Sequence, residues 1–456
     1  MKNEFFNFRI FLFGFLFCIL PIALYLNKVI FISMFIIIFF LLIFAKESSP
    51  EKWILLYIVS ASFFGISLFS IKLYDIILIF ALIYLLLIGK FKKINFAIVP
   101  FILFIAYLIV RLYLISTATT DTNYNSLGTL SLVRFLFALL ACVVFSQSFF
   151  STINIKRVIN KLDLFAIFLA IQIIVMRLCY QFWGSENNFL TGPFIVNLYG
   201  DSMVANSQRQ LEMRSCAFFS DPNKLMCFVL VLLLLRRFLL KNKEVHKKDF
   251  IYLICALLTG SRVAYMVALV YLLFFVFLRL MNENINLVLG IFLIIFSLFS
   301  IWLILSGDSI NGLLGKFSDT ILKVTGRTQT LGAGGEFSED GRFVIWKYSI
   351  PIILKHVVLG SGLASETVLL PYPTHNTFLF LLLNVGIVGT VMYIFSVLKI
   401  VIHRVSLTDF VLLALIPFLF LDLANYNALF FVFGLVLSNF HGGTKYENFD
   451  SRTYSK

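Results

Sequence analysis

Charged residues are scarce in this sequence. They make up 13% of its 456 residues, whereas hydrophobic residues make up 61%, and the mean hydropathy is +0.98. A soluble domain of this length needs more polar surface than that, so a soluble enzyme is excluded. Apolar stretches of about 20 residues recur along the chain and predict transmembrane helices.

Pairs of residues with metal-ligand spacing are also lacking. The six Cys lie mostly inside apolar runs, the five His are scattered, and no Asp-x-Asp pair stands in an outer loop. We therefore expect no metal, no cofactor and no disulfide framework. The N-terminus has a weak basic start and no small-residue cleavage site, so we expect no cleavable signal.

Basic residues outnumber acidic ones and give the chain a net charge of +14. Most Lys and Arg stand between apolar runs, where they orient helices and meet anionic lipid. No pattern typical of nucleic-acid binding is present, so we expect the lipid bilayer as a partner and no nucleic acid. The connections richest in Lys and Arg are those at 46–52, 90–93, 156–161 and 236–248.

These basic connections alternate with connections that are poor in Lys and Arg, and the alternation sets the orientation. With the N-terminus in the cytoplasm, residues 116–129 and 183–222 lie outside. The run 250–280 is too long for one straight span and is broken at Thr259-Gly260-Ser261-Arg262, where an arginine in hydrocarbon would be costly. We interpret it as two short helices, which places the following loop outside. The apolar runs lie at about 8–26, 29–45, 53–71, 73–89, 94–115, 130–150, 162–182, 223–240, 250–280, 285–305, 376–400 and 408–440.

The last apolar run is broken in the same way, at residues 422–427. The chain then crosses the membrane about twelve times and keeps both ends inside. The sequence thus predicts an all-α polytopic membrane protein that forms one integral membrane domain, residues 1–456. It also predicts one large outer loop at 306–375 and a cytoplasmic tail at 441–456.

The loop at 306–375 carries Lys, Arg, Asp and Glu in rough balance, and its middle, 318–339, indicates no role. Arg342 begins an amphipathic stretch near the end of this loop. A loop arginine of this kind is either an exposed surface residue or a ligand for an anion.

His375 precedes a strongly apolar run, and either Thr374 or Asn376 can cap the helix that begins there. A helix N-terminus favours nearby anions and keeps a neighbouring imidazole neutral. A neutral imidazole can accept a proton from a hydroxyl. The alternative is that His375 only caps the helix or lies at the membrane interface.

Arginines recur toward the outer ends of the predicted helices. The guanidinium of Arg262, with backbone N–H groups freed by the helix break, can bind a phosphate, or it can reach lipid headgroups. The other outer arginines either line a basic cavity suited to a pyrophosphate or anchor the helices at headgroups. They are Arg111, Arg134, Arg177, Arg209 and Arg214.

Polar motifs break the apolar pattern in a fixed order between residues 200 and 400. They are Asp221-Pro222-Asn223, Leu258-Thr259-Gly260-Ser261-Arg262, Gly341-Arg342 with Trp346, the segment 356–362, His375-Asn376-Thr377-Phe378-Leu379, and the segment 384–389. Together they resemble the bacterial O-antigen ligase and O-antigen polymerase superfamily. The first 180 residues match only in being membranous, and Asn384 stands where relatives often have Glu, which argues against an acidic function there.

The resemblance implies a membrane glycosyltransferase with a GT-C-like helical fold that works without metal at the periplasmic face of the bacterial inner membrane. Its donor is a glycan linked through pyrophosphate to undecaprenol. By the resemblance, Arg262 and Arg342 bind the pyrophosphate, where fixed guanidinium groups stabilise the leaving charge. His375 acts on the acceptor hydroxyl, and a positioned base contributes about 10²–10⁴-fold. The residues that we place around the substrate are Arg177, Arg214, Asn223 and Asn376.

The family contains two reactions that use the same donor end. A polymerase adds the growing chain to a new lipid-linked repeat unit, and a ligase transfers the finished chain to lipid A-core. We favour the polymerase, with a flippase and a chain-length regulator as partners, because divergence outside the motifs and a composition rich in Ile, Asn and Lys are typical of polysaccharide gene clusters. A transporter or flippase is the alternative from another class. It predicts charged residues near the membrane midplane and a repeat between two halves, and neither is evident.

Overall fold

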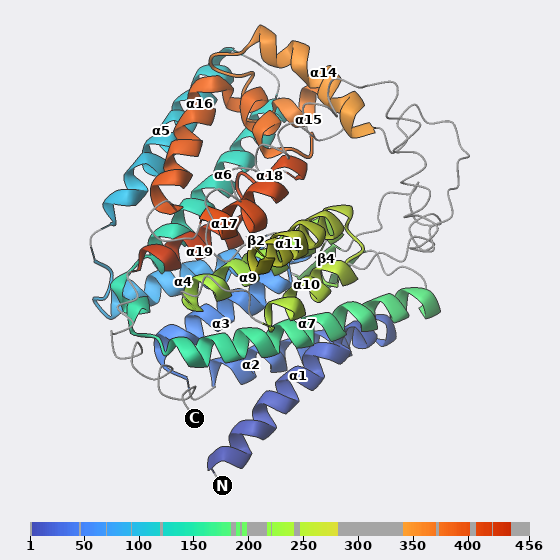
Figure 1. Cartoon of the computed structure of the whole chain (residues 1–456). Coiled ribbons are helices and arrows are strands. Elements are labelled where there is room, and N and C mark those ends of the chain that lie inside the picture. Colours follow the sequence, from blue (N-terminus) through green and yellow to red (C-terminus); the bar gives the residue numbers. More distant parts are fainter. Residues whose placement is uncertain are drawn as a thin grey trace.

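Helices make up most of the structure. The computed structural model describes residues 2–44, 47–69, 71–92, 94–118, 122–183, 188–191, 194–197, 217–219, 221–240, 247–280, 341–370, 374–401, 407–421 and 423–438. The elements in the first half (Figure 1) are α1 (Lys2–Leu26), α2 (Lys28–Ile43), α3 (Ser49–Ser62), β1 (Ile66–Leu68), β2 (Ile71–Lys72), α4 (Leu73–Leu87), α5 (Val99–Ala118), α6 (Thr122–Phe145), α7 (Ile155–Trp183), β3 (Asn188–Thr191) and β4 (Phe194–Asn197). Those in the second half are α9 (Pro222–Leu240), α10 (Asp249–Leu258), α11 (Arg262–Leu280), α14 (Gly341–Lys355), α15 (Ser365–Leu369), α16 (Thr377–Val401), α17 (Leu407–Phe410), α18 (Ile416–Phe420) and α19 (Asn427–Leu437).

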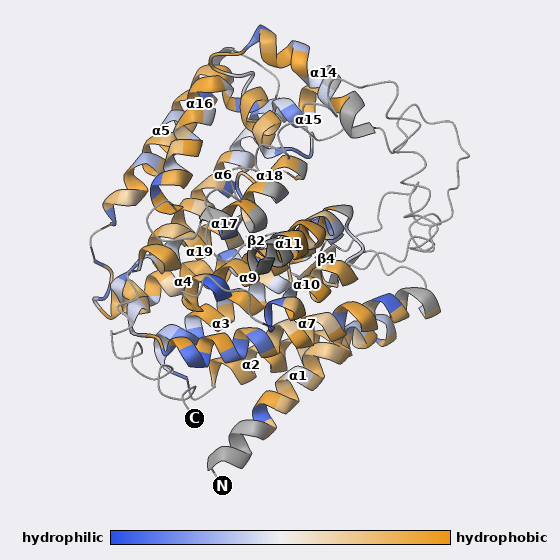
Figure 2. Cartoon of the chain, in the orientation of Figure 1, coloured by the Kyte–Doolittle hydropathy of each residue, from blue (hydrophilic) through white to orange (hydrophobic). Residues whose placement is uncertain are grey.

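Within this described part, five helical segments are long and apolar enough to cross a membrane, and apolar residues cover most of the helical surface (Figure 2). Shorter apolar helices, such as α4 and α19, accompany them. The expectation of a polytopic helical membrane protein is therefore confirmed. The number of twelve crossings stays a prediction, because the run 285–305 lies outside the described residues. The five long spans are Phe8–Leu26, Phe96–Thr117, Tyr124–Phe145, Ile155–Cys179 and Thr377–Val401.

Helix α9 lies at the centre of the molecule. On one side it packs against α7, which in turn packs against α1, and on the other it packs against α19, which packs against α6 (Figure 1). Nearly every side chain of α9 is buried, from Pro222 to Leu239. A helix that is apolar on all faces is stable only inside such a bundle.

Arg236 and Arg237, which the sequence indicates as cytoplasmic markers, are instead buried in an ion network at the end of α9. Arg236 Nε donates to Asp163 Oδ1 at 2.6 Å, and its Nη1 pairs with Asp249. Arg237 Nη1 pairs with Asp249 Oδ2 at 2.9 Å, and its Nε pairs with Asp409. The network ties α9 to α7, α10 and α17. Removing one partner would leave an uncompensated buried charge, so these two arginines act within the fold.

A small four-stranded sheet, in the order β2-β1-β4-β3, was not predicted. Strand β1 pairs with β4 in antiparallel register, with Ile66 opposite Val196 and Leu68 opposite Phe194. The sheet therefore joins the α3–α4 connection to the segment 183–222, which the sequence places outside. The apolar run 53–71 continues through β1 with only Gly65 before it, and an isolated glycine in an apolar run does not by itself indicate a strand.

The two predicted helix breaks are confirmed. Helix α10 ends at Leu258 and α11 begins at Arg262, while α18 ends at Phe420 and α19 begins at Asn427. Both breaks expose backbone polar groups within the bundle, and these groups must find partners there. Their partners assemble the candidate site.

Candidate functional site

Asn376 directly precedes α16 and caps it, as one of the two predicted caps. Its Oδ1 accepts hydrogen bonds from Phe378 N (2.9 Å) and Leu379 N (3.0 Å). Its Nδ2 donates to Leu419 O at 2.8 Å, which joins the start of α16 to α18. Both polar groups of the side chain thus hold the backbone, so Asn376 has a positioning role. Its contact with substrate stays a prediction.

His375 stands just before this cap in a left-handed backbone conformation, with φ of 49°. Its neighbour Thr374 is held at three points. Thr374 N and Oγ1 donate to Glu366 Oε1 at 2.7 and 2.5 Å, and Thr374 O accepts from Trp346 Nε1 at 2.7 Å. A histidine in this conformation is unfavourable in isolation and persists because the surrounding bonds fix it. The fold therefore keeps the partly exposed His375 in one strained position.

Arg342 lies in the first turn of α14, one helical turn before Trp346. Because the Trp346 indole is bonded to the residue preceding His375, the start of α14 is anchored to the His375 segment. Arg342 and His375 are 33 positions apart in the sequence, yet the side chain of Trp346 links their two segments through its hydrogen bond to Thr374 O. The side chain of Arg342 lies outside what the structure describes.

Asn223 and the Arg262 segment are also brought together. Asn223 lies in the first turn of α9, where its N donates to Asp221 Oδ1 at 2.7 Å. Its Oδ1 accepts from Ser261 Oγ, also at 2.7 Å. Ser261 directly precedes Arg262, the first residue of α11. The motif Asp221-Pro222-Asn223 and the α10–α11 helix break are thus in direct contact, which the sequence did not predict.

The second helix break, between α18 and α19, connects the His375 segment with the Asn223 segment. Thr377 Oγ1 donates to Leu421 O at 2.6 Å and accepts from Leu423 N at 2.9 Å. Farther along the same break, Tyr426 OH donates to Lys224 O at 3.2 Å. Four polar segments that are distant in sequence therefore form one hydrogen-bonded assembly, which we call the break cluster. It consists of residues 221–224, 259–262, 374–377 and the described residues of 421–426.

A group of basic side chains lies beside the break cluster. The sequence did not predict that these side chains form a group. Lys72 Nζ and Lys224 Nζ lie 5.2 and 5.1 Å from the centroid of the same ring, Phe64. Burial, and then the positive charges of Lys224 and Arg134, lower the pKa of Lys72 to about 8. Asp75, whose Oδ1 accepts from Asn427 Nδ2 at 2.7 Å, opposes this shift. The sequence does contain one sign of this group, because Lys72 is a single charged residue between two apolar runs.

The remaining predicted arginines have different places. Arg111 Nη2 donates to Gly360 O at 2.9 Å and so supports the scaffold. Arg177 lies near the C-terminal end of α7, which packs against α1. Arg209 and Arg214 lie outside the described residues. The structure therefore joins Asn223, Asn376, His375 and the backbones that carry Arg262 and Arg342, and it leaves Arg177 on a separate element.

Two glycines hold α14 and α15 against α16. Gly360 and Gly386 both have positive φ, 70° and 66°, and their backbones touch. A Cβ on Gly360 would lie 2.5 Å from Gly386 N, and one on Gly386 would lie 2.4 Å from Gly360 N. The approach lets Ser361 N donate to Leu383 O at 2.7 Å. This glycine contact explains why the two Gly motifs accompany the His375 motif, since it fixes the loop that carries Glu366.

Glu366 offers a test of how the His375 segment is held. Burial raises the pKa of the Glu366 carboxyl above its ordinary 4.5, against the smaller opposing effect of its bonds from Thr374. A carboxyl with a raised folded-state pKa contributes stability that is full below pH 4.5 and is lost as pH rises through the folded-state pKa. We expect the melting temperature of the purified protein to fall over that window and Glu366→Gln to flatten the fall. Glu366→Ala should be less stable by about 1–3 kcal/mol at every pH, because it strands the Thr374 donors.

Thr374→Val serves as the control for this series, because it removes the hydroxyl donor and keeps the N–H. It should lose part of the stability and keep the dependence on pH. If Glu366→Gln kept the full pH dependence of the wild type, a different group would be responsible.

No group of three or more His, Cys, Asp or Glu side chains in the described part of the chain is placed to hold a metal ion. The described residues place the His375 segment beside the starts of two helices, α11 and α14. Residues 249–394 match the family model described as O-antigen ligase. This stretch is about a third of the chain, and we refer to it by that similarity as the O-antigen ligase domain. The resemblance predicted from the motifs is confirmed for this stretch.

The O-antigen ligase domain contains three of the four segments that carry the predicted site: the α10–α11 break, the start of α14 and the start of α16. Asn223 and the second helix break lie outside it and complete the break cluster from either side. No curated protein and no solved structure matches the chain. The domain indicates a multi-pass membrane enzyme of O-antigen ligase or polymerase type.

Proposed function

We propose that the protein is a metal-independent glycosyltransferase that polymerises undecaprenyl-pyrophosphate-linked oligosaccharide repeat units into O-antigen or a related surface polysaccharide. The observation that carries the proposal is the break cluster. It joins the His375 segment to the start of α11, and the bond from Trp346 to Thr374 attaches the start of α14 to it, although these segments are far apart in the sequence. Buried polar assemblies of this kind are costly in a membrane and mark functional sites.

In the proposed reaction the hydroxyl oxygen of the acceptor sugar attacks the anomeric carbon of the donor glycan. The bond between that carbon and the pyrophosphate oxygen breaks, and the lipid pyrophosphate leaves with the electron pair. His375 takes the hydroxyl proton. Arg262 and Arg342 stabilise the charge on the leaving pyrophosphate. Lys72, Lys224 and Arg134 add positive potential beside the cluster, which favours an anionic substrate.

The site belongs at the periplasmic face of the inner membrane in this proposal. The basic connections then face the cytoplasm, together with the tail 441–456, and the loop 306–375 faces outward. A donor that carries its own pyrophosphate lipid suits a compartment without nucleotide sugars. A flippase would supply the substrate, and a chain-length regulator would act as a partner.

Reconstitution of the purified protein with the lipid-linked repeat unit tests the proposal. We expect a ladder of products that differ by one repeat, formed without added metal and in the presence of chelator. Protein that moved the lipid-linked repeat across the bilayer and never lengthened it would be a transporter, and the proposal would be wrong.

A deletion strain distinguishes the two reactions of the family. A polymerase deletion leaves a single repeat unit on lipid A-core, because ligation continues without elongation. A ligase deletion leaves lipid-linked polymer that never reaches the core. The second pattern would replace the polymerase with the ligase and keep the same donor site.

A further inference from the structure

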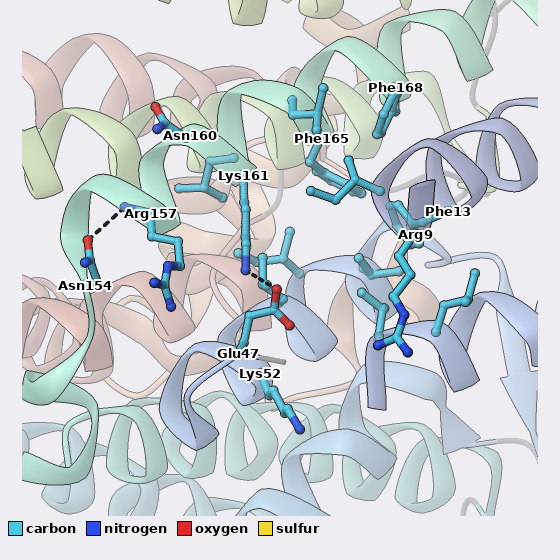
Figure 3. A pocket seen from close by; sticks show the side chains of 18 of the residues that line it. Arg9, Phe13, Glu47, Lys52, Asn154, Arg157, Asn160, Lys161, Phe165 and Phe168 are labelled. Atoms are coloured by element: carbon cyan, nitrogen blue, oxygen red, sulfur yellow. Dashed lines mark hydrogen bonds and ion pairs between the residues drawn. The ribbon is translucent and has the colours of Figure 1, made fainter. Parts of the chain in front are cut away.

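A cavity lies between α1, α2, α3 and α7 (Figure 3). Its volume is about 870 Å³, which is in the range of ligand sites. Apolar side chains make up most of its wall, among them Phe13, Leu41, Ile58, Phe165 and Phe168. Such a wall suits acyl chains.

The cavity is separate from the break cluster. Its polar residues include Lys52 at the start of α3, whereas Phe64, beside Lys72 and Lys224, follows the end of that helix. Lys52 and Phe64 are 12 positions apart, so the polar end of the cavity lies about 18 Å from Phe64 at 1.5 Å per residue. The cavity therefore needs a role of its own.

Cationic side chains gather at the polar end of the cavity. Among the described residues, four of the five cations that line the cavity, all except Lys156, have a partner for one N–H group, which leaves other N–H groups for a ligand. Lys52 Nζ donates to Ile43 O and Arg9 Nη1 to Phe44 O, each at 3.2 Å. Arg157, with a side chain that is 51% exposed, lies 3.6 Å from a Glu51 carboxylate oxygen. The five cations that line the cavity are Arg9, Lys52, Lys156, Arg157 and Lys161.

Glu47 is the one carboxylate among the residues that line the cavity, and it has an unused acceptor. Its Oε1 pairs with Lys161 Nζ, as Figure 3 shows. Only 8% of the Glu47 side chain is exposed. Its Oε2 is buried and accepts no hydrogen bond from the described residues. A buried acceptor without a partner calls for a hydrogen-bond donor on the ligand. The ligand must therefore offer an anion to the cations and a hydrogen-bond donor, such as a hydroxyl, to Glu47.

We propose that this cavity binds phosphatidylglycerol from the cytoplasmic leaflet. Its phosphate meets the cations, its glycerol hydroxyls donate to Glu47 Oε2, and its acyl chains lie along the apolar wall. The connections that supply Lys52, Arg157 and Lys161 face the cytoplasm in the predicted topology, where basic pockets between helices meet anionic lipid. The excess of positive charge disfavours phosphatidylethanolamine, whose ammonium group would meet cations. Free phosphate has no chains to fill the wall.

Native mass spectrometry of the purified full chain, titrated with dioleoyl phosphatidylglycerol, tests this site. We expect tighter binding than for dioleoyl phosphatidylethanolamine. Inorganic phosphate should not displace the lipid. Removing one cation weakens binding about fivefold, so Lys52→Gln/Arg157→Gln should weaken it on the order of 25-fold. Lys247→Gln, which changes an exposed lysine on another basic connection, should leave it unchanged.

Glu47→Gln tests the role of the hydroxyls. Phosphatidic acid has the same phosphate and chains but no headgroup glycerol, so the wild type should prefer phosphatidylglycerol over it. Glu47→Gln should lose that preference and still bind both lipids, because the cations remain. If the double variant failed to fold, the single Arg157→Gln variant would still test the site, since half of that side chain is exposed. Equal affinity for phosphatidylglycerol and phosphatidylethanolamine, or binding unchanged in Arg157→Gln, would overturn the proposal whether or not the protein makes polymer.

Discussion

Replacing His375 by alanine is expected to abolish long-chain polysaccharide while the protein still accumulates in the membrane. A positioned general base contributes about 10²–10⁴-fold to the rate, and loss of that factor would leave chains of one or a few repeat units. The side chain is only partly buried, so its removal opens no core cavity. Polysaccharide profiles of a deletion strain carrying each variant, together with the amount of membrane protein, measure both parts of the expectation.

The left-handed backbone at His375 calls for a second variant. Alanine at φ of 49° is strained, so loss of activity in His375→Ala could arise from a shifted loop. Asparagine tolerates this conformation better than alanine does and cannot act as a base at neutral pH. We therefore expect His375→Asn to be as inactive as His375→Ala. Activity restored by asparagine would show that the conformation matters and that the imidazole does not.

His356 is the matched control. It is exposed, it lies in the same domain just after α14, and it belongs to one of the motifs. His356→Ala should make polymer of normal length, because no described contact joins its side chain to the break cluster. Normal polymer in His375→Ala would instead exclude the proposed base.

The sequence was informative where a local departure from the apolar pattern had a local cause. The breaks near Gly260 and before Asn427, and the cap at Asn376, follow from residue types at a helix end, and the structure contains all three. The motifs of the O-antigen ligase domain were readable for the same reason. The local pattern could not predict which helix breaks contact one another. Thr377 and Tyr426 bind backbone atoms of their partners, and every sequence provides such atoms.

Pairings between distant charged residues were likewise hidden. In the sequence, Arg236 and Arg237 resemble the basic residues of a cytoplasmic connection. Their partners Asp163 and Asp409 are distant in the sequence and come close only in the folded chain. Lys72 and Lys224 are separated by the length of several helices and meet at one phenylalanine ring. Each of these groups is unremarkable in the sequence and acquires its role from packing.

Gly386→Ala is expected to separate the loop between α14 and α15 from α16. We expect this variant to lose both activity and stability. Gly386 has φ of 66° and ψ of −171°, a region that is essentially restricted to glycine. A Cβ there would also lie 2.4 Å from Val358 O and 2.4 Å from Gly360 N, and both are backbone atoms that cannot rotate away. Strain and overpacking together should cost roughly 2–6 kcal/mol. Thermal unfolding of the purified variant and its polysaccharide profile measure the two losses.

Gly89→Ala separates the two causes of this loss. Gly89 also has a positive φ, 62°, but a Cβ built on it meets nothing within 4 Å. This variant should show a modest loss of stability and normal polymer, because it carries strain without a clash and lies far in the sequence from the O-antigen ligase domain. If Gly386→Ala were no worse than Gly89→Ala, the glycine contact would not hold the loop. If it were folded but inactive, the contact would act by setting the position of Glu366, and through Thr374 the position of His375.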